Sequence, residues 1–239
     1  MNFSPSTDDA TTGTATAALP AVVLFDVNET LSDMSSMADR FVDVGAPAHL
    51  MVTWFATLLR DGFALTAAGA TAPFAQLSTG VLRASLPAWP LNRSVDEAIA
   101  HVMGGFGELA VHDDVSAGLL ALAALDTRLV TLSNGARVVA ELLFARAGLS
   151  GHFEQLLSVE DAGVWKPAPA AYAYAAAQCD VTPAEMMLVA VHPWDIDGAA
   201  RAGLRTAWIN RTGTTYPDYF RGPTLEAISL PHLARLLAL

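Results

Sequence analysis

Four polar clusters in this chain combine side chains that can perform chemistry, and each either follows an apolar run or begins a helix. They are Asp26 with Asn28 and Thr30, Ser133 with Asn134, Lys166, and His192 with Asp195. Taken singly each is ordinary, because an Asp after a strand more often caps a helix or forms a turn. Their order along the chain instead predicts one catalytic centre, with the carboxylate of Asp26 as the nucleophile.

The elements that must position these clusters are short apolar strands. Residues 19–25 form an apolar, β-branched run that ends at Asp26, and similar runs cover 128–132, 186–191 and 205–210. Fully apolar runs of this length fit strands buried on both faces of a parallel sheet. Polar residues that follow such strands lie at the carboxyl edge of the sheet, where open α/β sheets bind ligands.

Residues 34–110 have a different pattern. Helical stretches rich in Ala, Leu, Met and aromatic residues are broken by Gly and Pro, with no convincing strand between them. We expect helices at roughly 36–43, 47–60, 73–84 and 93–105.

After this insertion, strands and helices alternate again. Helices are expected near 115–124, 137–147, 168–178 and 231–238, residues 198–203 are expected inside a further helix, and a further short strand is expected at 153–158. The alternation predicts an α/β fold, a doubly wound parallel sheet with an inserted helical cap. The expected division is a flexible tail at 1–18, a core at 19–33 and 111–239, and a cap at 34–110.

The order of the motifs resembles the haloacid dehalogenase superfamily. Four stretches carry the resemblance: LFDVNETL at 24–31, TLSNG at 131–135, VWKP at 164–167 and WDIDGA at 194–199. The likeness extends over residues 20–238. It implies a Rossmann-like core with a cap inserted after the first strand, in agreement with the pattern above.

The resemblance also implies a role for each residue. Asp26 would form a covalent ester or acyl phosphate, and Thr30 would hydrogen-bond the nucleophile or an incoming group. Ser133 and Asn134 would bind the anionic end of a substrate at the start of a helix. Lys166 would hold Asp26 ionised. Asp195 would either orient Lys166 or activate the hydrolytic water.

Two activities of the superfamily compete for this chain. Phosphatases similar to it place an acidic residue where Asn28 stands, and a magnesium-binding Asp where Ala190 stands. Asn28 cannot protonate a leaving alkoxide, whereas a halide leaves without a proton. The sequence therefore favours metal-free hydrolysis of a short 2-haloalkanoic acid, as in type II (L-)2-haloacid dehalogenases. A Mg²⁺-dependent phosphatase acting on a small metabolite is the alternative, and a non-catalytic scaffold that binds small carboxylates is the third hypothesis.

Other positions are candidates for the substrate site. Val27 and Asn28 of the first motif would contact the substrate, and the resemblance adds Tyr172. His192 could be a general base or a hydrogen-bonded structural residue.

The expected cap helix departs from the dehalogenase pattern. Phe55 stands where those enzymes carry a halide-binding arginine, and Arg60 lies five residues further on. Trp54, Phe55 and Phe63 could line an apolar wall around a small substrate, or could simply pack the cap onto the core.

The composition limits the partners. The formal net charge of −11 disfavours nucleic acid, and no apolar run reaches the length of a membrane span. The first residues do not resemble a secretory signal, so we expect a cytoplasmic protein. We expect a small anionic substrate. We expect no cofactor, because Mg²⁺ is needed only for the phosphatase alternative. The resemblance implies a homodimer.

Overall fold

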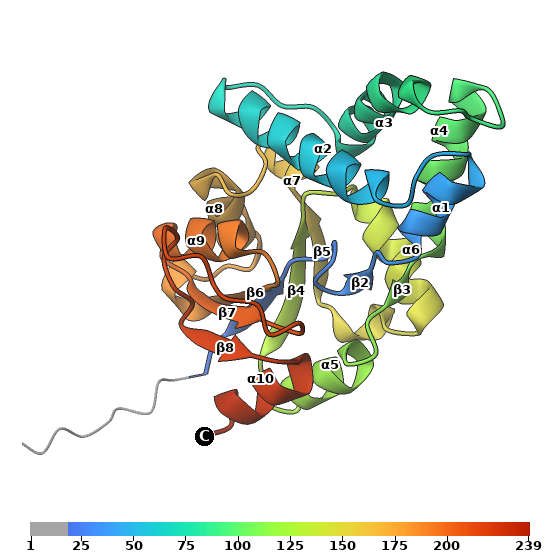
Figure 1. Cartoon of the computed structure of the whole chain (residues 1–239). Coiled ribbons are helices and arrows are strands. Elements are labelled where there is room, and N and C mark those ends of the chain that lie inside the picture. The colour runs from blue at the N-terminus through green and yellow to red at the C-terminus, as the bar shows by residue number, and fades with distance from the viewer. Residues whose placement is uncertain (1–18) are drawn as a thin grey trace, which may run out of the picture.

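The computed structural model describes residues 19–239, so the tail expected at 1–18 lies outside the described residues. Its centre is a parallel sheet of six strands in the order β5-β4-β1-β6-β7-β8 (Figure 1). The strands are β1 (Val22–Phe25), β4 (Arg128–Ser133), β5 (Gln155–Ser158), β6 (Met186–Ala190), β7 (Arg205–Ile209) and β8 (Leu225–Ala227). β1 therefore lies in the middle of the sheet, between β4 and β6.

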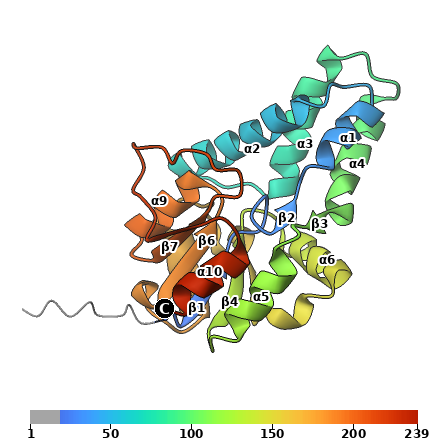
Figure 2. The ribbon, with the colours of Figure 1, turned by 60° about the horizontal axis from the view of Figure 1, so that its bottom comes forward.

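Helices cover both faces of the sheet. The helices α5 (Val115–Ala123), α6 (Arg137–Ala147) and α10 (Leu230–Leu237) lie on one face, and α8 (Pro169–Gln178) and α9 (Pro193–Arg201) lie on the other (Figures 1 and 2). A short α7 (Val159–Ala162) follows β5, and 3₁₀ turns span Ser150–His152 and Pro183–Glu185. This is the predicted doubly wound α/β fold, and the prediction is confirmed.

The segment between β2 (Ser32–Asp33) and β3 (Ala110–Val111) is called the cap here. β2 and β3 pair with each other antiparallel. The cap contains α1 (Met37–Asp43), α2 (Leu50–Ala67), α3 (Phe74–Ser85) and α4 (Val95–Gly104), with 3₁₀ turns at Leu86–Ala88 and Gly105–Glu108. Both views show these helices grouped to one side of the sheet (Figures 1 and 2).

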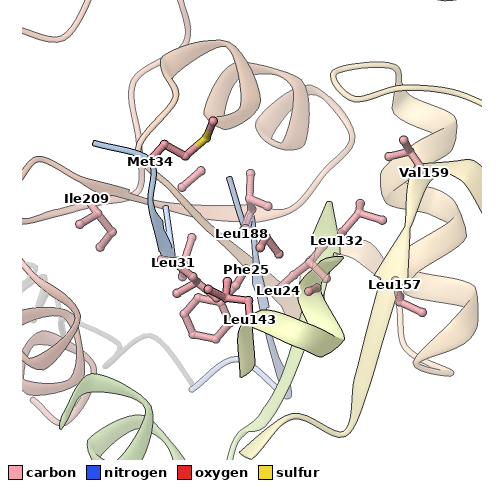
Figure 3. Packing of buried hydrophobic residues seen from close by; sticks show 14 of the residues in the cluster. Leu24, Phe25, Leu31, Met34, Leu132, Leu143, Leu157, Val159, Leu188 and Ile209 are labelled. Atoms are coloured by element: carbon pink, nitrogen blue, oxygen red, sulfur yellow. The ribbon is translucent and has the colours of Figure 1, made fainter. Parts of the chain in front are cut away.

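The core forms because every residue of β1 is buried and apolar, which is the pattern of a strand covered on both faces. Figure 3 labels Leu24, Leu132, Leu157 and Leu188, which come from four adjacent strands and pack in one buried cluster. Burial of this apolar surface stabilises the sheet. The strand order fixes which carboxyl ends are neighbours.

The sequence patterns missed the smallest elements. β2 and β3 have two residues each, too few to show any alternation. The second cap helix continues to Ala67, past the expected end at 60, because no Pro or strong stop signal interrupts it. No helix in the described part of the chain is long and apolar enough to cross a membrane.

The cap packs closely on the core around Trp165. A Cβ built on Gly62 of α2 would lie 2.5 Å from the ring of Trp165, so only glycine permits this approach. The Trp165 indole N–H donates to the carbonyl of Ala72, 3.0 Å away. The Phe63 ring lies 4.9 Å from that of Trp194 on α9. Aromatic contacts therefore close the cap over the loops that follow β5 and β6.

We predict that Gly62→Ala lowers the free energy of unfolding by about 1–3 kcal/mol, because the added methyl overpacks the contact with Trp165. Gly80→Ala, in the cap helix α3, is the matched control. Its new Cβ would meet nothing within 4 Å. The control should gain up to about 1 kcal/mol of helix propensity. Urea unfolding of both variants tests this, and equal effects would contradict the described packing.

Candidate active site

The carboxyl ends of β1, β4 and β6 bring the predicted clusters together. Asp26 follows β1, Ser133 ends β4, and His192 comes two residues after β6. The register places Phe25 beside Thr131 and Val189. The Asp26 amide donates to the carbonyl of Val189, so the residue is held at the edge of the sheet.

Asp26 is a buried carboxylate with both oxygens engaged, and only 3% of the residue is exposed. The Thr30 hydroxyl donates to Oδ2 at 2.6 Å, and Lys166 Nζ donates to Oδ1 at 2.9 Å. The Val191 amide donates to the Thr30 hydroxyl oxygen, which ties the loop after β1 to the end of β6. These contacts fix the orientation of the carboxylate.

Lys166 is fully buried and bridges two carboxylates. Its Nζ also donates to Asp195 Oδ2 at 2.6 Å. The Tyr172 hydroxyl donates to Asp195 Oδ1 at 2.5 Å, so both oxygens of Asp195 are occupied. Asp26, Lys166, Asp195 and Tyr172 are called the lysine cluster below.

The charges in the lysine cluster set its ionisation. Burial alone would raise the pKa of Asp26, but the Lys166 ammonium, with help from His192 and Thr30, outweighs it and holds this pKa below its usual value. Burial opposes the charge on Lys166 as well, yet Asp195 and Asp26 together raise its pKa. Burial, followed by the charge of Asp195, raises the pKa of Tyr172 well above its usual value. Asp26 is therefore an anion, Lys166 a cation and Tyr172 a neutral donor at pH 7.

Ser133 and Asn134 are buried at the end of β4. The Ser133 hydroxyl oxygen accepts from the Gly135 amide at 2.8 Å. The Asn134 side chain accepts from the Lys166 amide at 3.0 Å and donates to its carbonyl at 3.4 Å. Asn134 therefore holds the backbone of Lys166, an arrangement that the sequence did not reveal.

Val27 and Asn28 are also buried, in the loop after β1. The side-chain amide of Asn28 lies beside Gly135, where a Cβ would be 3.4 Å from it. Asn28 therefore lies next to the end of β4, whereas Val27 packs in the hydrophobic core.

His192 lies beside Asp26 with one ring nitrogen surrounded by oxygens. Its Nε2 lies 3.2 Å from the Asn28 carbonyl, 3.6 Å from Asp26 Oδ2 and 3.5 Å from Glu29 Oε2. A carbonyl only accepts hydrogen bonds, so Nε2 carries a hydrogen and donates it. The ring stacks on Trp194 at 5.1 Å.

Glu29 is a neighbour of the site that the sequence did not single out. It has φ of 62°, a left-handed conformation that is rare for residues other than glycine. Its carbonyl accepts from His112 Nε2 at 2.9 Å. The sequence motif contains Glu29 but carries no signal of its backbone conformation. His112 thus contacts the loop after β1.

The structure does not bring the cap candidates to the lysine cluster. The Trp54 indole donates to the carbonyl of Ser78 and its ring packs against Phe41 and Phe106 within the cap. Phe55 is buried beside Trp54. Arg60 is exposed and pairs with the adjacent Asp61. Among the described residues, no arginine forms an ion pair with Asp26; Lys166 does so, and His192 Nε2 lies 3.6 Å from Asp26 Oδ2.

A cavity of about 470 Å³ lies between the cap and the core, beside Glu29 and His192. Apolar side chains that include Met34, Met51 and Trp208 line it together with polar ones that include Asp33 and Arg211. Among residues 19–239, no group of three or more His, Cys, Asp and Glu side chains is arranged to hold a metal ion.

A family model described as haloacid dehalogenase-like hydrolase matches residues 20–203. The chain belongs to this family. It is 29% identical over 216 residues to (S)-2-haloacid dehalogenase 1 of Pseudomonas sp. (strain CBS-3), covering 90% of this chain and 95% of the relative. It is 30% identical over 220 residues to (S)-2-haloacid dehalogenase 4A of Burkholderia cepacia, and the match covers 90% of this chain and 94% of that relative.

Solved structures agree with this membership. The crystal structure of a dehalogenase with an intermediate complex superimposes with a TM-score of 0.85 at 27% identity, covering 93% of this chain and 99% of that one. The family and fold class expected from sequence are confirmed, and the chain is a hydrolase. The roles of individual site residues stay predictions.

We predict that Asp26→Asn leaves the free energy of unfolding unchanged or raises it by about 1 kcal/mol. The lysine cluster contains two carboxylates and one ammonium. The substitution leaves Asp195 paired with Lys166, and the charges of this pair cancel. Lys166→Met, in contrast, leaves two buried carboxylates unpaired and should cost about 3–5 kcal/mol. Urea unfolding at pH 7 measures the free energy of unfolding of both variants. A larger loss in Asp26→Asn than in Lys166→Met would contradict an ionised Asp26 beside a charged Lys166.

Proposed function

We propose that this hydrolase removes halide from a short 2-haloalkanoic acid through an ester formed on Asp26, without a metal ion. The observation that carries the proposal is the buried Asp26 carboxylate, held by Lys166 and Thr30 with its pKa lowered. An ionised, oriented carboxylate is the form that attacks carbon.

In the first step, a carboxylate oxygen of Asp26 bonds to C2 of the substrate while the carbon–halogen bond breaks. The halide leaves with the bonding electrons and requires no proton. The position two residues after the nucleophile agrees with this, because Asn28 has no acidic proton. Water then cleaves the ester, which returns the Asp26 carboxylate and releases a 2-hydroxy acid.

The relatives support the choice of substrate class. The two reported above are named 2-haloacid dehalogenases, and the structure that superimposes with a TM-score of 0.85 is that of a dehalogenase with an intermediate complex. We propose that Ser133, at the end of β4 before α6, binds the carboxylate of the acid. Tyr172 donates to Asp195 and so would act through the lysine cluster rather than on the substrate.

The chemistry of the donor set disfavours the phosphatase alternative. Mg²⁺ requires free carboxylate oxygens in near-octahedral geometry. The oxygens of Asp26 and Asp195 already accept from Lys166, Thr30 and Tyr172. The Lys166 ammonium thus stands between the two carboxylates. The expected homodimer and cytoplasmic location stay predictions.

We predict that a single turnover in H₂¹⁸O places ¹⁸O in the carboxylate of Asp26, because water attacks the ester carbonyl and not C2. The measurement is mass spectrometry of the peptide containing Asp26, with the peptide of Asp26→Asn as the control. Halide release without label in this peptide would overturn the covalent route. The non-catalytic scaffold hypothesis predicts binding without halide release.

We also predict that the rate of halide release is unchanged by EDTA or added Mg²⁺, since Lys166 already supplies the positive charge at Asp26. Parallel assays with an aryl phosphate test the alternative. Phosphate release that depends on Mg²⁺ and exceeds halide release would establish the phosphatase in place of our proposal.

A further inference from the structure

The cavity between the cap and the core, of about 470 Å³, is larger than the smallest acids of the proposed class require. A cavity of about 150 Å³ is enough to hold benzene, which has as many non-hydrogen atoms as 2-bromopropionate. A molecule of that size would fill only about a third of the space. The cavity therefore has room for a longer substrate, an inference that rests on the proposed function.

The cavity shares His192 with the surroundings of the nucleophile. The His192 side chain lines the cavity, and its Nε2 lies 3.6 Å from Asp26 Oδ2. Val191 lines the cavity as well, and its amide donates to the Thr30 hydroxyl that holds Asp26. The ring of His192 thus adjoins both the cavity and the nucleophile.

The strand order places the cavity on the opposite side of Asp26 from Ser133. β4 and β6 flank β1, and β7 lies beyond β6. Ser133 ends β4, whereas the cavity is lined by residues that follow β6 and by Ile209, which ends β7 and is labelled with Met34 in Figure 3. An acid with its carboxylate at Ser133 and C2 at Asp26 directs its alkyl chain towards the cavity.

Several polar side chains of the cavity already have partners in the protein. Arg211 pairs with Asp114 at 3.0 Å, and the Asn210 side chain hydrogen-bonds to the backbone of Thr214. His112 Nε2 contacts a backbone carbonyl at 2.9 Å. A polar ligand would have to displace these partners.

Apolar residues supply another part of the wall, namely Met34, Ala38, Met51, Val52, Trp208 and Ile209. A hydrocarbon chain needs no hydrogen-bond partner, and its transfer from water to such a surface is favourable. The lining therefore suits an alkyl group.

The fixed charges around the cavity disfavour a second carboxylate on the ligand. Asp33 lines the cavity, and the hydrogen bond from the Ser35 backbone lowers the pKa of its carboxyl group, so Asp33 is an anion at pH 7. Arg211 is the only Lys or Arg among the described residues that line the cavity, and Asp114 balances its charge. A carboxylate at the far end of an alkyl chain would therefore be repelled.

We propose that this cavity binds the alkyl chain of the substrate, and that the preferred 2-haloalkanoic acid carries about four carbons beyond C2. The carboxylate of the acid lies at Ser133, C2 lies at Asp26, and the alkyl chain runs beside His192 into the cavity. The bonds that form and break are those of the reaction described above.

The first test compares 2-bromohexanoate with 2-bromopropionate on the wild-type protein. Each methylene group that moves from water into the cavity should raise kcat/KM by a factor of about 4. The kcat/KM for 2-bromohexanoate should therefore exceed that for 2-bromopropionate by at least about 10-fold. Initial rates of bromide release measure both values, and a kcat/KM that does not rise with chain length would overturn the proposal.

The second test replaces the methyl end of 2-bromohexanoate by a carboxylate, as in 2-bromoadipate. The added charge should lower kcat/KM by at least about 10-fold, because it would be buried near Asp33 without a cation to pair with it. Equal kcat/KM values for the two acids would contradict an alkyl chain that ends in the cavity.

Ala38→Phe tests the location, because Ala38 is a partly buried residue of α1 that lines the cavity. The added ring should lower the ratio of kcat/KM for 2-bromohexanoate to that for 2-bromopropionate by at least about 10-fold. Ala75→Phe is the matched control, since Ala75 is exposed on α3 and does not line the cavity. The control should keep the wild-type ratio.

Val52→Trp is a second variant that folding should tolerate, because Val52 lines the cavity yet is 68% exposed. It should lower the same ratio. The wild-type ratio in Val52→Trp would overturn the proposal, whether or not Ala38→Phe folds.

Failure of this inference differs from failure of the proposed function. Bromide release from 2-bromopropionate with no gain for 2-bromohexanoate would overturn only the role of the cavity. A wild-type protein that releases no halide from any 2-haloacid would overturn the proposed function, and this inference with it.

Discussion

The Lys166 ammonium, buried between the carboxylates of Asp26 and Asp195, is the interaction on which the site depends. A buried charge is costly unless it is paired and hydrogen-bonded, and this one has partners at 2.9 Å and 2.6 Å. The cluster has one carboxylate more than it has cations. A nucleophilic carboxylate must be negatively charged. Burial alone would favour protonation of Asp26, and the Lys166 ammonium keeps this carboxyl group ionised.

Several elements of the fold hold Lys166 in that position. Lys166 lies in a loop, so its backbone needs a support, and the Asn134 side chain provides it from the end of β4. Thr30 and the Val191 amide join the loop after β1 to the end of β6. The central place of β1 in the sheet makes these contacts possible. Trp165, next to Lys166, packs under Gly62 of the cap, so closure of the cap also fixes the lysine loop.

The sequence predicted the sheet from strong local signals, whereas the pairing of Lys166 with Asp26 and the place of Tyr172 at the site were implied by the family resemblance. Apolar runs mark the strands, and a parallel sheet brings Asp26, Ser133 and Asp195 to one edge. The cap candidates are placed away from that edge for a geometric reason. At about 100° per residue, Arg60 points roughly 140° away from Phe55 on the same helix, and it faces solvent. Glu29 was missed because what distinguishes it is a backbone angle, and its contact with His192 joins residues far apart in the chain.

Lys166 keeps Asp26 ionised inside the protein, and a measurement of the pKa of Asp26 in the folded protein tests this. Carbon-13 NMR of protein labelled at the Asp carboxyl carbons follows each carboxyl group as the pH is lowered, and loss of one signal in Asp26→Asn identifies Asp26. We predict that Asp26 remains ionised below pH of about 3.9, the usual pKa of an Asp side chain. Protonation of Asp26 above that value, in the folded protein, would contradict it.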